Sequence, residues 1–238
     1  MFTDLWLTDY ELAALFLSLK VSSVAVFFAL PCAVIIAFVL SKYHFRGKVL
    51  LEAITYLPLV LPPVVVGYLL LMLLSNQSIL GQFLQTHFSI SLAFRWQGAA
   101  VAVAVVALPL MVRSIRLGFD LIDLRLGQAA ATLGAPPMKV FVTIYLPLAL
   151  PGIIAGILLG FARGLGEFGA TITFAANIAG QTQTLPLAMY TYIQTPGAEM
   201  AALRLCIISI LVSIFALIAS EMVNTLMKNK VYGVVKND

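Results

Sequence analysis

The chain has 238 residues, of which 62% are hydrophobic and only 10% are charged, with a net charge of +4. In a soluble domain about 25% of the residues are charged. A chain this poor in charge cannot cover its surface without large apolar patches. The composition therefore excludes a soluble enzyme and indicates an integral membrane protein. The fourteen Lys and Arg residues form no dense stripe, which argues against a nucleic-acid partner.

Five long apolar segments follow one another along the chain. Two of them, 21–40 and 54–74, contain no charged residue. A spanning helix needs about 20 residues, and in hydrocarbon the backbone must satisfy its own hydrogen bonds. We therefore predict an all-α, polytopic membrane protein that forms a single transmembrane domain over residues 1–238. Its five spans are expected at about 12–40, 54–74, 98–117, 144–163 and 204–227.

Basic residues gather on one side of these spans. Ten of the fourteen lie in the first connection, at the end of the third span and in the connection that follows it, and in the C-terminal tail: Lys42, Arg46, Lys48, Arg113, Arg116, Arg125, Lys139, Lys228, Lys230 and Lys236. The N-terminus, in contrast, carries Asp4, Asp9 and Glu11. Because basic connections stay in the cytoplasm, we expect the N-terminus outside, the C-terminus in the cytoplasm, and a multi-pass location in the inner membrane.

The segment 164–202 fits this scheme least well. Residues 171–179 are too few to span, 181–184 are polar, and 185–193 are only mildly apolar. Two alternatives are a pair of re-entrant or interfacial segments at the outer mouth of a pathway, and an external cap helix. A sixth span here would place the basic tail outside, against the charge rule.

The sequence contains no recognisable set of residues for covalent chemistry. Gly47-Lys48 is followed by Val49 and so forms no phosphate-binding loop. His44 and His87 have no metal-ligand partners nearby in the sequence, and no serine-centred nucleophile elbow is present. We expect no catalytic residue, no metal and no cofactor in this chain.

The connection at about 120–141 has the pattern of a helix-turn-helix. An aspartate suits the start of the first helix, Gly134 suits its end, and Pro136 suits the first turn of the next helix. Small and apolar groups share one face of the first helix: Ala129, Ala130 and Leu133. Such a face suits close approach by another protein. The alternative is a short amphipathic helix lying on the membrane.

The same connection resembles the EAA loop of ABC-importer permeases. The resemblance lies in the spacing: Gln-Ala-Ala is followed after three residues by Gly, and after nine more by Ile-x-Leu-Pro. Gln stands in place of the leading Glu. The resemblance implies a cytoplasmic coupling helix that docks into a groove of a separate ATPase, which would be the subunit that uses ATP. The expected coupling-loop residues are Gln128, Ala129, Ala130, Leu133, Gly134, Ile144, Leu146 and Pro147.

Four further segments resemble the molybdate, tungstate and sulfate branch of this family: 57–67, 164–171, 194–197 and 204–209. The resemblance implies a type I-like importer permease for molybdate, with sulfate or tungstate as the alternative substrates. It further implies a homodimer, cytoplasmic ABC ATPase subunits and a periplasmic molybdate-binding protein as partners. A secondary transporter should show paired repeats with charges at the midplane, and a membrane assembly factor would not require the loop spacing.

Two features of the spans are candidates for the pathway or its gate. Arg163 and Glu167 lie four positions apart, so they can form an ion pair, either as a structural link or as pathway groups. Pro62 and Pro63 should kink the second span, which suits either packing or a gate.

Glycines repeat every four residues in the fourth span: Gly152, Gly156, Gly160 and Gly164. Such a row lets another helix approach closely. The partner can be a helix of the same chain, or the row can form a dimer or pathway face.

Overall fold

A computed structural model of the chain describes residues 8–232. Asp4 and Lys236, two of the charged residues used to orient the chain, lie outside this range. The described residues are helical and contain no strand, which confirms the all-α prediction. In chain order the helices are α1 (Asp9–Lys42), α2 (Lys48–Val60), α3 (Pro63–Leu74), α4 (Ile79–Phe88), α5 (Trp96–Asp120), α6 (Leu124–Thr132), α7 (Pro137–Val140), the π-helix η1 (Phe141–Tyr145), α8 (Leu146–Leu148), α9 (Leu150–Leu165), α10 (Gly169–Ala175), α11 (Leu185–Ile193) and α12 (Glu199–Tyr232).

Three helices, α1, α5 and α12, are each long and apolar enough to cross a membrane. Two further pairs have the composition of one span that is bent at a break. These are α2 with α3, bent by 113°, and the 137–148 segment with α9, bent by 68°. The described residues thus provide three candidate spans, or five if each bent pair is one span.

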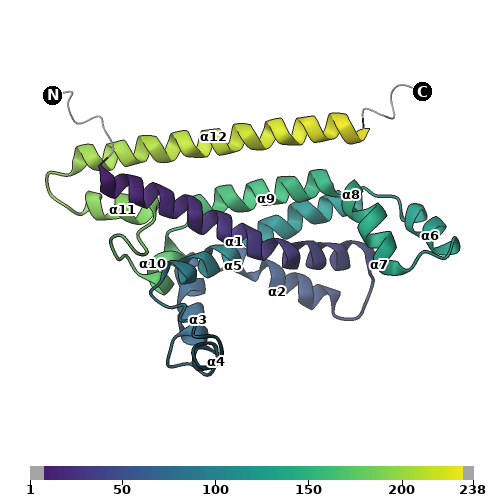
Figure 1. Cartoon of the computed structure of the whole chain (residues 1–238), viewed down its shortest axis with the longest axis horizontal. Helices are drawn as coiled ribbons and strands as arrows, with labels where there is room; N and C mark the ends of the chain where they lie inside the picture. The colour runs from purple at the N-terminus through teal and green to yellow at the C-terminus, as the bar shows by residue number, and fades with distance from the viewer. Residues whose placement is uncertain (1–7, 233–238) are drawn as a thin grey trace.

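The centre of the molecule is α5, which packs along both α1 and α9 (Figure 1). Ala33 and Ala37 of α1 are fully buried, and their small side chains let the helices approach closely. Met111, Ile115 and Phe119 of α5 are also fully buried in the same cluster. This core fixes the relative positions of α1, α5 and α9, and the candidate site is attached to one end of these three helices.

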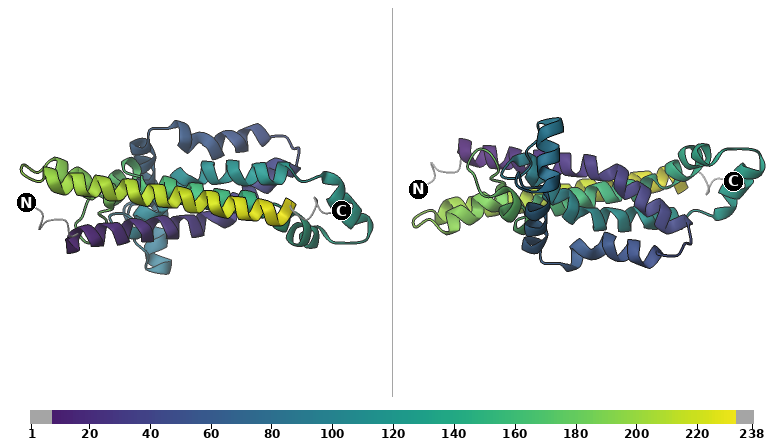
Figure 2. Two further views of the ribbon diagram at one scale, coloured as in Figure 1. Left: turned by 90° about the horizontal axis from the view of Figure 1, so that it is seen from above. Right: turned by 90° about the horizontal axis from the view of Figure 1, so that it is seen from below.

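On one side of this bundle lies α12 (Figures 1 and 2). It packs against α9 and α11 and leaves many of its apolar side chains exposed, among them Ile207, Leu211 and Phe215. An exposed apolar face of this length suits lipid or another spanning helix.

The kink predicted at Pro62 and Pro63 is a complete break. Pro62 is the N-cap of α3 and Pro63 lies in its first turn. Proline has no amide hydrogen, and its ring clashes with the carbonyl of the preceding turn, so two consecutive prolines end α2 and start α3. Because of the 113° change of direction, α3 leaves the side of the bundle and carries α4 at its end (Figure 1).

The start of the fourth span and the connection after the second span differ from the sequence prediction. The fourth span was expected from 144, but α9 begins at Leu150, after a bend at Ala149. The cause is Pro151, which lacks the amide hydrogen that would bond the carbonyl of the preceding turn. The 76–97 connection also contains a helix, α4, which Ser78 caps by accepting a hydrogen bond from the Gly81 amide at 3.0 Å.

The segment 164–202 contains two short helices, α10 and α11, rather than a single one. The first packs against α3 and α5, and the second packs against α1 and α12. Both lie at the end of the molecule where α1 begins (Figure 1).

Candidate functional site

A helix-turn-helix at one end of the molecule carries the first half of the predicted coupling loop. Asp123 Oδ1 accepts a hydrogen bond from the Arg125 amide at 2.9 Å and caps α6. The turn that follows α6 contains Gly134, whose φ of +82° favours glycine. The next helix starts at Pro137, one residue later than predicted, because Pro136 is its N-cap. As a result α6 projects beyond the ends of α1, α5 and α9 (Figure 1).

The projecting helix presents the small and apolar face that the sequence predicts. Gln128 and Ala129 are exposed, and Ala130 is half-buried. Leu133 is 88% exposed, so its side chain has almost no contact within the chain. An exposed leucine beside small side chains suits insertion into a pocket of another protein.

The second half of the loop motif lies elsewhere. Ile144 is in η1, and Leu146 and Pro147 are in α8, where the chain leads toward α9. Leu146 packs against the central core cluster. The structure therefore separates the motif into an exposed part, 128–134, and a packed base, 144–147.

An aromatic cluster joins this base to the end of α1. The Phe38 ring lies 5.4 Å from that of Tyr145 and 5.3 Å from that of Phe119, between centroids. The hydroxyl of Tyr145 lies against Gly127 of α6, leaving no space for a side chain there. These contacts attach α6 firmly to the bundle, and no local sequence pattern predicted them.

A cavity of about 270 Å³ lies between α6 and the aromatic base. Beside it, Lys42 Nζ donates a hydrogen bond to the Ile122 carbonyl at 2.8 Å, which ties the end of α1 to the segment that precedes α6.

Arg163 and Glu167 form the ion pair that their spacing predicts. Arg163 Nη1 lies 2.7 Å from Glu167 Oε2. The other carboxylate oxygen of Glu167 accepts a hydrogen bond from the Ala170 amide at 2.7 Å, and the side chain is buried. The pair therefore fixes the turn between α9 and α10.

Close backbone contact then joins α10 to α3. A Cβ on Gly67 would lie 2.6 Å from the Ala170 carbonyl oxygen, and one on Gly169 would lie 2.9 Å from Pro63 Cβ. The four gate candidates, Pro62, Pro63, Arg163 and Glu167, are thus brought together through α10, although they come from two different spans.

The glycine row of α9 packs within the chain. A Cβ on Gly152 would lie 2.8 Å from Gly118 Cα, and one on Gly156 would lie 2.8 Å from Ile115. Gly160 faces Met111, and Gly164 faces Val103 and Ser22. The row is therefore covered by α5 and α1, which leaves it unavailable as a dimer face.

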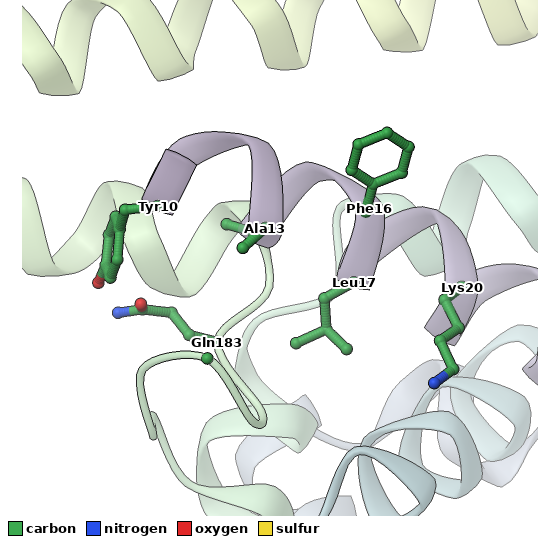
Figure 3. A pocket seen from close by; sticks show the side chains of 8 residues that line it. Tyr10, Ala13, Phe16, Leu17, Lys20 and Gln183 are labelled. Carbon is green, nitrogen blue, oxygen red and sulfur yellow. The ribbon is translucent and has the colours of Figure 1, made fainter. Parts of the chain in front are cut away.

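A cavity of about 200 Å³ lies between the first turns of α1 and the loop around Gly180 (Figure 3). Tyr10 and Gln183 lie at one end of it and Lys20 at the other (Figure 3). Lys20 Nζ lies 3.8 Å from the centre of a Trp96 ring, in cation–π geometry. Lys20 is the only charged residue of α1 between Glu11 and Lys42, and no sequence motif marked it as functional.

Comparison with known proteins places this architecture in a family. Residues 29–229 match the family described as "Binding-protein-dependent transport system inner membrane component". The chain is 57% identical over 215 residues to the Molybdenum transport system permease protein ModB of Escherichia coli (strain K12), which covers 90% of this chain and 94% of that protein. It is 52% identical over 220 residues to ModB of Haemophilus influenzae, covering 92% and 96% of the two chains.

The fold is similar to that of a chain in inward-facing structures of the MetNI methionine ABC transporter. The TM-score is 0.70 at 16% identity, over 93% of this chain and 99% of that chain. The matches in sequence and fold both extend over most of the chain, and this chain therefore belongs to the family of binding-protein-dependent transport system inner membrane components.

Proposed function

We propose that this chain is the membrane-spanning subunit of an ABC importer for molybdate. Two lines support the substrate: the 57% identity to a molybdenum transport permease and its nearly full-length coverage. The chain would act as a homodimer with two cytoplasmic ATPase subunits and a periplasmic molybdate-binding protein. ATP would be bound and hydrolysed by the ATPases alone.

The observation that carries the coupling role is the exposed face of α6 with Leu133 at its end. Closure of the ATPases would move the two α6 helices of the dimer. Because α6 is held to α1 and α5 through Tyr145, Phe38 and Phe119, the movement is transmitted to the spans rather than absorbed in a flexible loop. The spans would then tilt between inward-open and outward-open arrangements.

Lys20 and Trp96 mark the outer boundary of the membrane in this proposal, since Trp and Lys anchor at the interface. A span of about 20 residues from there reaches the region of Leu40 on α1 and Arg116 on α5. Both positions lie toward the end of the bundle that carries α6, so α6 would be cytoplasmic and the N-terminus external. The C-terminus of α12 would be cytoplasmic.

The test is molybdate uptake by vesicles containing this chain, its ATPase and the binding protein. Ala130→Arg should abolish uptake and copurification of the ATPase while the chain remains inserted, because a long charged side chain blocks close approach to α6. Survival of both would contradict the coupling role. If sulfate displaced molybdate from the binding protein, the substrate assignment would be wrong.

A further inference from the structure

A cavity of about 480 Å³ lies between α2 and the last two turns of α5. It lies on a different part of the chain from the coupling loop and the outer cavity. Its lining residues are Tyr56, Leu59, Arg113, Arg116, Leu117 and Asp120. Two guanidinium groups, one carboxylate and one phenol ring thus line a single space.

Arg116 contacts two carboxylates, that of Asp120 in the cavity lining and that of Glu52 on α2. Arg116 Nη1 lies 2.7 Å from Glu52 Oε1, and its Nε lies 3.7 Å from Asp120 Oδ2. Ser41 donates a further hydrogen bond to the other oxygen of Asp120, at 2.5 Å. Arg116 is therefore held in place from both sides.

Arg113 is different, because the residue is exposed and its side chain has no hydrogen bond or ion pair with any group that the structure describes. It lies seventeen residues after Trp96, the proposed outer boundary, which is about 26 Å along the helix and therefore near the inner edge of a hydrocarbon core of about 30 Å. Ionisable residues within spans face a cavity or a partner rather than lipid. The space beside Arg113 is the α2–α5 cavity.

We propose that the α2–α5 cavity binds a tetrahedral oxyanion, with Arg113 as the binding residue and Arg116 as a positioning residue. The guanidinium fork matches two oxygens of such an anion. Arg113, Arg116, Glu52 and Asp120 together have no net charge, so the site binds weakly. Weak binding is what a transport pathway needs, because a site on the path must also release the ion.

In naming the transported anion, this inference rests on the proposed function. The phosphate group of an anionic lipid has the same chemistry and is the second possible source of the ligand. The two sources can be separated because one is added as a salt and the other as a vesicle component.

The experiment measures access to the cavity in the full-length chain assembled with its ATPase. Leu117→Cys supplies a thiol in the cavity, with Cys32→Ser and Cys206→Ser removing the two native cysteines. Labelling by a thiol reagent is followed in phosphatidylcholine vesicles without added oxyanion, with millimolar sodium molybdate or with millimolar sodium sulfate, and in vesicles containing phosphatidylglycerol. Protection by molybdate identifies the transported anion, and protection by phosphatidylglycerol alone identifies a lipid phosphate.

In either case Arg113→Gln should remove the protection, and Arg113→Lys, which keeps the charge but not the fork, should retain part of it. Arg46→Gln is the matched control, since Arg46 is an exposed arginine outside the cavity. To test the positioning role, Arg116→Lys is compared with the unmodified chain. The molybdate concentration needed for protection should rise severalfold in this variant. Equal labelling under all conditions, or protection that survives Arg113→Gln, would overturn the proposal.

This readout needs neither ATP nor the binding protein. A complex that imports sulfate instead of molybdate would therefore still show protection by sulfate, which separates an error in the substrate from an error in the site. Normal molybdate uptake without protection by either source would overturn the site alone.

Discussion

The carboxylate of Glu11 and the guanidinium of Arg204 lie 2.7 Å apart, although 193 positions separate them in the sequence. Glu11 is fully buried and also accepts a hydrogen bond from the Thr8 amide at 2.8 Å, so it caps α1 and joins it to α12. Nearby, the rings of Tyr10 and Tyr192 meet edge to face at 5.8 Å. These contacts fix the N-terminal end of α12, a helix with many exposed apolar side chains.

Glu11→Gln should therefore destabilise the chain. The amide can still accept from Thr8 but no longer neutralises Arg204, and a hydrogen bond to a charged group contributes about 2 kcal/mol. We expect a lower melting temperature of the purified protein in detergent. Glu199→Gln is the control, because Glu199 is an exposed acid on α12, the helix that carries Arg204. Equal melting temperatures of the two variants would contradict the role assigned to the ion pair.

The glycine row gives a prediction with an internal control. Gly152→Ala would place a Cβ 2.8 Å from the Gly118 backbone, so α5 and α9 must separate. Overpacking of this kind costs about 1–3 kcal/mol, and the melting temperature should fall. Gly166→Ala is the control, because a Cβ at Gly166 would have no packing neighbour within 4 Å. This variant should leave the melting temperature unchanged. An unchanged melting temperature for Gly152→Ala would show that the two helices are not in close contact.

Local sequence signals predicted the features that depend on one or two neighbouring residues. Pro62 and Pro63 predicted the interruption of the second span, Gly134 predicted the left-handed turn after α6, and the i,i+4 spacing predicted the Arg163–Glu167 pair. Each follows from a missing amide, a permitted φ angle or the helical repeat.

Features that depend on how helices meet could not be predicted from one sequence. The Glu11–Arg204 pair and the aromatic base around Phe38 join residues far apart in the chain, and nothing local marks them as neighbours. A proline pair predicts a break but not its angle of 113°. The helix α4 was missed because its ten residues are too few to span a membrane and mix apolar with polar side chains, as a connection also can.

The link between α9 and α3 predicts that transport depends on Glu167 as one part of a pair. Glu167→Gln leaves Arg163 without its partner and weakens the turn that holds α10, so molybdate uptake should fall about tenfold or more. Because both side chains act in one contact, the Arg163→Gln/Glu167→Gln double variant should transport about as well as either single variant. Additive losses in vesicle uptake would mean that the two residues act independently.

The rigid attachment of α6 predicts an uncoupled transporter when Gly127 gains a side chain. A Cβ at this position would overlap the Tyr145 hydroxyl, and the Tyr145 ring cannot move away freely because it packs against Phe38. Gly127→Ala should therefore tilt α6 from its base. We expect ATP hydrolysis by the assembled complex to continue while molybdate uptake per ATP falls severalfold.

Tyr145→Phe tests whether this contact is the cause. The substitution removes the overlapping oxygen and keeps the ring that packs on Phe38, so alone it should leave uptake close to that of the unmodified chain. Combined with Gly127→Ala it should restore part of the lost uptake, because the nearest remaining ring atom, 2.8 Å from the added Cβ, needs only a small shift. If the double variant were as poorly coupled as Gly127→Ala, the effect of Gly127 would lie in the proposed contact with the ATPase and not in its contact with Tyr145.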